Sequence, residues 1–246
     1  MVNNFLPHRD LIYLDGVSIN TIGYYAEMPQ PVPPAKQRYT IWQSGDTDHS
    51  APDDSFEDVE YSITVRKLRS PNDFKATDLY ALAANAKTLI VSRHSGRYYL
   101  IRRLIGITPA AQIRGNDLSY RITFALAPFA YHLDNPTHTL DAQHVQLNNP
   151  GTRYSRPLYQ CNHSTAADSI LSVNGVNLTI SKDAANPIYI DCKRMIAYNS
   201  DHENQTQYTS GQFPFLQTGA NLLSVFSGTT GYEFYEFYVT GNWRDY

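Results

Sequence analysis

Apolar and polar residues alternate along much of the chain, which is the pattern of half-buried β-strands. The alternation begins in LIYLDGVSIN, around the dipeptide Asp15-Gly16, which is typical of hairpin turns. It returns in RYTIWQS, residues 38–44, and in VEYSITVRKL, residues 59–68. We therefore predict strands in all three segments.

Two segments of the same half break the alternation. MPQPVPP, residues 28–34, holds too many prolines for a central strand, so we predict an extended edge or arm. SGDTDHSAPDDS, residues 44–55, is acidic and rich in turn-forming residues, so we predict an exposed loop.

A helical pattern follows these strands. The segment SPNDFKATDLYALAANAKTL predicts one helix, over about residues 72–89. Ser70 or Asn72 can cap this helix. Pro71 suits its first turn, and Asp73 faces the positive end of the helix dipole. Four apolar side chains near helical spacing are expected to pack on a sheet rather than line a binding groove: Phe74, Leu79, Leu82 and Ala86.

The sequence after the helix returns to strands. LIVSRHSGRYYLIRRLIGITPA predicts two strands joined by a turn at Ser95-Gly96, and LSYRITFALAPFAY predicts another that ends at Pro128. Over residues 131–157 the sequence changes to Asn, Pro, His and Thr with little periodicity. We place a domain boundary in this segment, near Asp134.

Beyond the boundary, several short strands around turns are typical of a β-sandwich. They are RPLYQCN, SILSVNGVNLTIS, PIYIDCKRMIAYN, NLLSVFS and YEFYEFYVTGNW. The predicted fold class is mainly β. An N-terminal β domain with one helix, residues 1–133, precedes an all-β sandwich, residues 134–246.

The last of these strands is rich in aromatic residues, and its alternation separates two rows. One row is expected in the sandwich core: Tyr235, Phe237 and Val239. The other row remains for a protein partner or a sugar: Phe234, Glu236 and Tyr238. Core plus protein interface is favoured over a platform for sugar stacking.

Composition narrows the classes of function. The chain has 246 residues, of which 19 are Tyr and 17% are charged, with a net charge of −3. That charge argues against a global attraction to nucleic acid or anionic membranes. No apolar run approaches the ~20 residues of a membrane span or the form of an export signal. We therefore expect a soluble protein made in a reducing cytosol.

Cysteine chemistry is expected to be structural. In a reducing compartment Cys161 and Cys192 are expected to be two buried thiols rather than a disulfide. Three Asn-x-Ser/Thr matches are then interpreted as chance: Asn162, Asn177 and Asn204.

The charges are unevenly distributed along the N-terminal half. Between Ser44 and Glu60 there are seven acids and no Lys or Arg, whereas from Arg66 to Arg121 there are eleven Lys or Arg against three acids. The seven acids are Asp46, Asp48, Asp53, Asp54, Glu57, Asp58 and Glu60. Either these are two oppositely charged surfaces of one domain, or a basic face meets an acidic partner or a neighbouring subunit.

Motifs for catalysis and cofactors are absent from the sequence. It contains no GxGxxG, Walker loop, HExxH, CxxC pair or GxSxG. The spacing of His132, His138 and His144 suits neither a helix face nor a compact metal loop, so solvated histidines are favoured over ligands. The acid pairs of a glycosidase would have to come from a surface loop that leaves them hydrated: Asp53/Asp54 and Asp58/Glu60. We therefore assign no catalytic, cofactor-binding or metal-binding residue and no cofactor.

The order of these segments resembles the distal tail proteins (Dit) of long-tailed phages that infect Gram-positive bacteria. The resemblance begins with LIYLDGVSINTIG, the proline-containing arm at residues 28–34 and the single helix at 72–89. It continues with GQFPFLQTGANLLSV, residues 211–225, and with the terminal Asn242-Trp243-Arg244. One departure is the turn after the second strand, which reads SGDT where family members often carry a Gly-Arg-Asp-Gly-like turn.

The resemblance implies a structural role at the phage tail tip. Such proteins form a hexameric ring through their N-terminal domains, with a galectin-like, jelly-roll C-terminal sandwich projecting outward. The ring is a hub that joins the tail tube to the tail-associated fibre or lysin protein and to baseplate or receptor-binding components. The implied partners are further copies of the chain, the major tail tube protein, the tape measure protein and these tip proteins. The implied location is the virion, after assembly in the host bacterial cytoplasm.

Three functional hypotheses stand at this point. The leading one is a non-enzymatic ring subunit in which the segment from Ser44 to Glu60 reaches the basic face of the next copy. The alternative is a carbohydrate-binding protein whose C-terminal sandwich holds cell-wall saccharide. A glycan hydrolase is the third.

Overall fold

The protein is represented by a computed structural model, which describes residues 12–27, 29–44, 47–67, 77–92, 96–113, 117–140, 144–163, 165–227 and 237–245. Only the backbone is described at residues 42–44, 47–49, 52–54, 111–113, 117–118, 140, 144 and 227. The chain divides into two compact units, Met1–Leu133 and Asp134–Asp245.

The first unit is built on an antiparallel sheet whose strands follow the order β2-β1-β7-β8-β9-β6-β3. These strands are β1 (Ile12–Leu14), β2 (Val17–Ser18), β3 (Tyr24–Ala26), β6 (Val59–Lys67), β7 (Thr88–Val91), β8 (Arg97–Ile113) and β9 (Asp117–His132). The predicted hairpin at Asp15-Gly16 is confirmed, because both turn residues have positive φ and β1 pairs with β2 across them. A 3-10 helix, η1 (Ile19–Ile22), follows β2 and begins where Ser18 accepts a hydrogen bond from the backbone N–H of Asn20.

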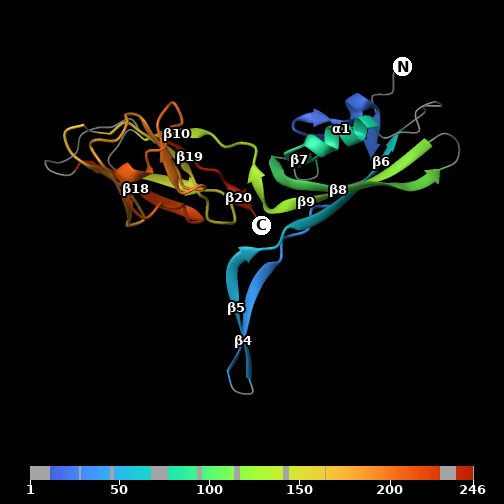
Figure 1. The fold of residues 1–246 in the computed structure, drawn as a ribbon, viewed down its shortest axis with the longest axis horizontal. Helices are drawn as coiled ribbons and strands as arrows, with labels where there is room; N and C mark the ends of the chain where they lie inside the picture. Colours follow the sequence, from blue (N-terminus) through green and yellow to red (C-terminus); the bar gives the residue numbers. More distant parts are fainter. Residues whose placement is uncertain are drawn as a thin grey trace. The chain divides into compact units, whose positions relative to one another are not determined.

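One face of this sheet carries the core of the first unit. In β6, alternation places Tyr61, Ile63 and Val65 among the buried residues, next to Ile122 and Phe124 of the adjacent strand β9. The helix α1 (Thr77–Asn85) packs on this core face through Leu79 and Ala83, both fully buried. Figure 1 shows α1 on one side of the sheet.

The helix prediction is confirmed in type and position but is wrong at its C-terminal end. Thr88 and Leu89 belong to β7, because Leu89 pairs with Tyr99 of β8 and is fully buried. Of the four apolar side chains predicted to pack on the sheet, Leu79 and Ala86 are buried and Leu82 is half-buried. The predicted capping residues and Phe74 lie outside the described residues, as do residues 1–11.

The predicted loop at residues 44–55 is wrong where the structure describes it. β4 (Gln37–Ser44) and β5 (Thr47–Phe56) form a separate two-stranded antiparallel sheet, the hairpin, visible in Figure 1. Pro52 lies opposite Tyr39 in its register. Both hairpin strands have one edge without a strand partner among the described residues, and a proline without an N–H is tolerated on such a strand.

β9 also departs from its prediction, because it continues through Pro128 to His132. Leu126 pairs with Ile101 of β8, and Ala130 pairs with Tyr99. Residues 127–129 therefore occupy an interval where β8 has a single residue, and this bulge accommodates the proline without ending the strand.

β8 is long and irregular. Its register against β9 shifts at four places between Tyr99 and Ala111. On its other edge β8 pairs with β7 only at Tyr99 and Leu100, and the N–H of Ile101 still donates to Lys87 O at 2.7 Å. Among the described residues, no strand pairs with that edge beyond this point.

The proline-rich segment forms neither helix nor strand over residues 29–36. Val32 is buried in the first core, and the Tyr61 hydroxyl donates a 2.5 Å hydrogen bond to Gln30 O. The segment is therefore held along the unit by specific contacts.

The second unit is a sandwich of two five-stranded antiparallel sheets, which confirms the predicted fold class. One sheet has the order β10-β19-β12-β15-β16: β10 (Thr137–Leu140), β19 (Phe237–Thr240), β12 (Leu158–Cys161), β15 (Ile188–Asp191) and β16 (Ile196–Tyr198). The other has the order β11-β18-β13-β14-β17: β11 (His144–Asn149), β18 (Gly219–Ser227), β13 (Ser169–Val173), β14 (Val176–Ile180) and β17 (Thr209–Gly211). Two short elements complete the unit, η3 (Thr206–Tyr208) and β20 (Arg244–Asp245).

Apolar side chains at alternate positions along the strands fill the space between these two sheets. Phe237 and Val239 are buried as predicted, whereas Tyr235 lies outside the described residues. Cys161 and Cys192 are free and buried in the same core, which confirms the prediction of two buried thiols. Within the described residues, no helix is long and apolar enough to cross a membrane.

Candidate interaction surfaces

The histidines singled out by their spacing lie on three different strands. His132 ends β9, His138 lies in β10 with its ring 6.3 Å from that of Trp243, and His144 begins β11. Across the described residues, no group of three or more His, Cys, Asp or Glu is placed to hold a metal ion.

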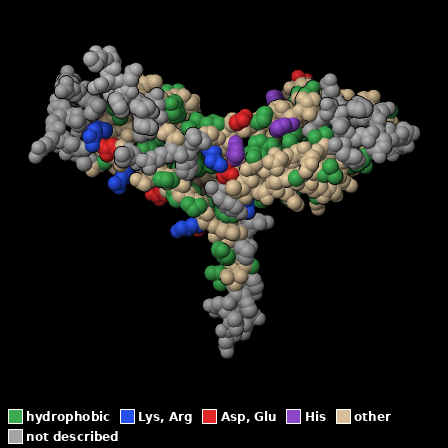
Figure 2. Space-filling view, turned by 180° about the vertical axis from the view of Figure 1, so that it is seen from behind, with side chains coloured by type: hydrophobic (Ala, Val, Ile, Leu, Met, Phe, Trp, Pro, Cys, Tyr) green, Lys and Arg blue, Asp and Glu red, His purple; other side chains and the backbone are tan. Residues whose placement is uncertain are grey.

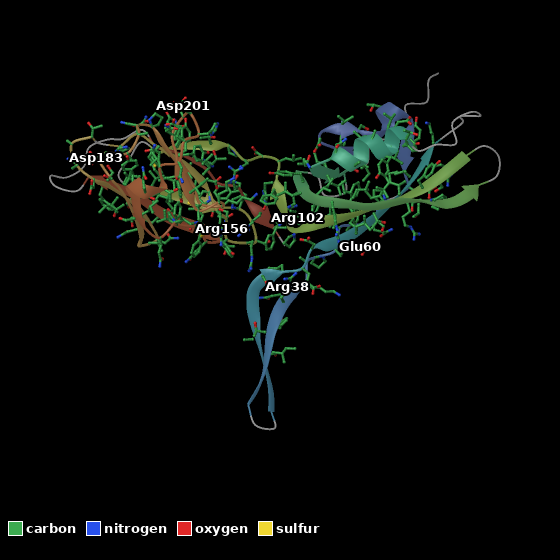
Figure 3. The ribbon with its side chains drawn as sticks, viewed as in Figure 1. Arg38, Glu60, Arg102, Arg156, Asp183 and Asp201 are labelled. Atoms are coloured by element: carbon green, nitrogen blue, oxygen red, sulfur yellow. The ribbon has the colours of Figure 1, made fainter. Side chains whose placement is uncertain are left out.

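The acid pairs considered for hydrolysis lie on or near the hairpin. The side chains of Asp53 and Asp54 are outside the described residues, while Asp58 and Glu60 are exposed. Arg102 Nε lies 3.7 Å from Asp58 Oδ1, so the Asp58 carboxylate has a cation beside it within the same chain. The general acid of a glycosidase is held in a desolvated site, and neither Asp58 nor Glu60 is buried. Figure 3 labels Glu60 and Arg102 on the ribbon of this unit.

The hairpin presents a surface that is apolar near its middle. Ile41 is 71% exposed and Tyr39 is 58% exposed, and the two share one face of β4 because they are two residues apart. Arg38, Thr40 and Ser50 are exposed as well. Figure 2 shows hydrophobic side chains open to view on the described part of the hairpin, and Figure 3 places Arg38 at its base. We call these five residues the hairpin surface.

The first unit has a second exposed surface, on the side of the sheet opposite α1. Cross-strand neighbours on this side are Ser62 and Thr123, whose hydroxyls are 2.9 Å apart, and Arg121, which lies between Thr64 and Thr108. We call this surface the open sheet face and define it by Ser62, Thr64, Arg103, Thr108, Arg121 and Thr123. Most of these side chains are exposed, and Thr64 and Thr123 are half-buried.

An apolar side chain lies beside these polar residues. Ile105 is the extra residue of the bulge between Leu104 and Gly106. It is 48% exposed and is not part of the core, whereas Leu104 packs against the core.

The predicted basic set divides into paired and unpaired cations. Arg66 forms an ion pair with Glu27, and Lys67 forms one with Asp78. Arg103 and Arg121 are exposed, and no ion pair joins either of them to a described residue. Arg69, Lys75, Arg93 and Arg114 lie outside the described residues or their side chains do. The open sheet face therefore presents two exposed cations, and the exposed acid Glu60 lies on the same side of the sheet, opposite Ala125 and in line with Arg103.

The second unit has an aromatic row across its first sheet. Gln160 lies between Tyr238 and Tyr189, and Tyr189 pairs with Tyr198. The rings of Tyr189 and Tyr198 are stacked, with centroids 5.4 Å apart and an interplanar angle of 6°. A sugar-stacking platform needs an open ring face, and this stack turns one face of each ring toward the other. The row therefore favours packing between side chains over sugar binding.

One buried asparagine, Asn221, fixes the conformation of the segment FPFLQTGAN, residues 213–221. Asn221 is 1% exposed, and its Oδ1 accepts from Gln217 N–H at 2.7 Å and from Asn174 Nδ2 at 2.8 Å. Its Nδ2 donates to Gln217 O and Gly219 O at 2.9 and 2.8 Å. The segment is thus a loop closed around one buried amide.

The fold is Dit-like: in the described part of the chain, a β-rich unit with one α-helix is followed by a β-sandwich. The crystal structure of the SPP1 Dit protein has the same fold, with a TM-score of 0.67 and 14% sequence identity over 94% of this chain and 97% of that chain. SPP1 Dit is described as a paradigm of the hub adsorption apparatus in phages that infect Gram-positive bacteria. No protein-family model matches the chain, and no curated protein matches it in sequence.

Proposed function

We propose that this protein is a structural component of a phage tail tip, a distal tail protein whose copies form a hexameric ring. The observation that carries the proposal is the likeness to SPP1 Dit over nearly the full length of both chains. A likeness confined to one sandwich would support many functions, since sandwiches are shared by unrelated proteins. Coverage of both units in the same order is a more specific match.

In this proposal the ring is a hub. It joins the tail tube to the tail-associated fibre or lysin protein, with the tape measure protein and receptor-binding components as further partners. The chain acts without enzymatic activity. Exposed acids and dispersed histidines support this, because neither arrangement supplies a desolvated acid or a built metal site. The protein then resides in the virion, at the tip of the tail.

The first experiment is the solution mass of the purified protein. Six copies of the 27.9 kDa chain give about 167 kDa by light scattering after size exclusion. The second is immunogold labelling of particles of the phage that encodes the chain, where label is expected at one end of the tail. Particles that lack the protein, or that carry it elsewhere, would overturn the proposal whatever the mass in solution.

A further inference from the structure

Asn174 and Gly175 form the turn between β13 and β14, and they are the one Asn-Gly pair in the sequence. Their φ angles are 50° and 84°, as in the two-residue hairpin turns that Asn-Gly favours. Both residues are exposed, so water reaches them. Because glycine has no side chain to shield its backbone nitrogen, that nitrogen can approach the asparagine side chain whenever the turn is free to move.

The side chain of Asn174 takes the place of a main-chain carbonyl. The pairing of β13 with β18 ends at Val173 and Leu223. Beyond that pair, the N–H of Asn174 donates to Leu222 O at 2.9 Å, and the N–H of Leu222 donates to Asn174 Oδ1 at 2.9 Å. The side-chain oxygen therefore extends the strand pairing by one residue.

The nitrogen of the same amide is bonded to a buried group. Asn174 Nδ2 donates to Oδ1 of Asn221 at 2.8 Å, and Asn221 is 1% exposed. The Nδ2 of Asn221 donates to the backbone oxygens of Gln217 and Gly219, so this buried amide cannot turn over without losing both bonds. Residue 174 must therefore present a donor here, and a carboxylate has none.

We propose that Asn174 is a latent site of self-modification, which the folded second unit keeps closed. When the hydrogen bonds to β18 open, the backbone nitrogen of Gly175 attacks Cγ of Asn174 and forms a new C–N bond. The side-chain nitrogen leaves as ammonia, taking the proton of the Gly175 nitrogen, and a cyclic imide remains. Water then opens the imide at either carbonyl, which gives aspartate or isoaspartate.

The hydrogen bonds of the fold oppose both the reaction and its reversal. In the folded unit both polar atoms of the amide are held on β18, so two hydrogen bonds must break before Cγ meets the Gly175 nitrogen. The aspartate product accepts from Leu222 as before but faces Asn221 Oδ1 with a second acceptor. The isoaspartate product adds a methylene to the main chain of a two-residue turn. A chain that has reacted therefore loses the bond that holds the loop at residues 213–221 to the turn.

Peptide mapping by mass spectrometry measures the reaction in the full chain. Purified protein is kept at mildly alkaline pH, folded in buffer or unfolded in guanidinium chloride, and the deamidated fraction of Asn174 is followed with time. Deamidation is expected to be at least about tenfold slower in the folded protein, because two hydrogen bonds must break first. Asn242 precedes the bulky Trp243 and is the internal control, expected to react far more slowly than Asn174 in guanidinium chloride. Equal rates at Asn174 in the two samples, or equal rates at the two asparagines when unfolded, would overturn the proposal.

A variant tests whether the product fits the native loop. Asn174→Asp reproduces one product, and Asn177→Asp on β14 is the matched control, because it adds the same charge at an exposed position of the same unit. Asn174→Asp is expected to lower the urea midpoint of the second unit, while Asn177→Asp leaves it nearly unchanged. Equal midpoints would overturn the one-way character of the reaction.

Limited proteolysis of partly deamidated wild-type protein gives the same comparison where Asn174→Asp does not fold. Chains that have reacted at Asn174 are expected to be cut first, and equal cutting of reacted and intact chains would again overturn the one-way character. Neither measurement depends on assembly, so the inference stands or fails independently of the proposed ring.

Discussion

The carboxylate of Asp15 accepts hydrogen bonds from Thr88 twice, from the backbone N–H at 2.7 Å and from the hydroxyl at 2.9 Å. The N–H of Lys87 donates to the same carboxylate at 2.9 Å, and the N–H of Asp15 donates to Thr88 O at 3.1 Å. The turn of the first hairpin is thereby fixed to the start of β7. Burial acts to raise the pKa of Asp15, but the hydrogen bonds from Lys87 and Thr88 outweigh it, and the pKa lies below its ordinary value.

Asp15→Asn is expected to destabilise the first unit at neutral pH, because hydrogen bonds to a charged acceptor are stronger than those to a neutral one. The expected loss is about 1 kcal/mol or less, because this site is largely exposed. Asn tolerates the positive φ of this turn, so the change isolates the charge. Since the folded pKa is lowered, the stabilisation is present above the unfolded pKa of about 3.9 and is lost as the pH falls through the folded pKa. Urea unfolding at pH 7 and pH 3 measures this. A difference of equal size at both pH values would contradict the charge explanation.

Tyr159→Phe is expected to leave the second unit as stable as before or to raise its free energy of unfolding by up to about 1 kcal/mol. Tyr159 is fully buried, and in the described part of the chain its hydroxyl has no hydrogen-bond partner, so removing the hydroxyl removes a desolvation cost. Tyr61→Phe is the matched control. It removes the hydrogen bond to Gln30 O and is expected to cost about 1 kcal/mol in the first unit. Thermal unfolding of both variants gives the comparison, and equal losses would refute the distinction.

The two thiols are expected to be unreactive in the folded protein. Burial raises the pKa of Cys161 well above its ordinary value, with a smaller contribution from Cys192, and burial likewise raises the pKa of Cys192. Both thiol pKa values are raised in the folded protein, so the folded state keeps these thiols protonated. Their contribution to the stability of the second unit is therefore present below the unfolded thiol pKa of about 8.5 and is lost as the pH rises above it. Labelling with a thiol reagent at pH 8 is expected to follow unfolding of the second unit. Rapid labelling of the native protein would show that the thiols are accessible.

Gly241→Ala is expected to destabilise the second unit by about 1–3 kcal/mol, the usual range for overpacking a core. A Cβ at Gly241 would overlap the ring of the buried Trp243. Gly106→Ala is the control, since a Cβ there meets nothing within 4 Å and its φ is ordinary. Urea unfolding of both variants should show a loss only for Gly241→Ala, and equal effects would exclude the steric explanation.

Much of the fold could be predicted from alternation, because one buried face leaves a period of two in the sequence. Tyr61, Ile63 and Val65 illustrate this in β6, and Phe237 and Val239 in β19. The hairpin strand β5 could not be predicted in this way. It has no buried face among its described residues, so its sequence is that of a solvated segment, and only its pairing with β4 makes it a strand.

The surfaces were harder to predict than the core. Excess positive charge between Arg66 and Arg121 is visible in the sequence, but the unpaired members Arg103 and Arg121 are distinguished only by the register of β8 against β9. That register shifts four times between Tyr99 and Ala111, and local sequence does not fix the positions of bulges. The prediction that a strand ends at Pro128 is wrong for the same reason, because a bulge accommodates this proline within β9.

The irregular outer edge of β8 has a consequence for the chain before it meets its partners. A long, flat, unpaired strand edge recruits strands from any neighbour, and copies would then polymerise into filaments. Repeated bulges, and a proline at residue 109 that cannot donate a hydrogen bond, interrupt that edge and keep it from serving as a template. This edge is therefore a poor site for a strand of another copy to add to the sheet.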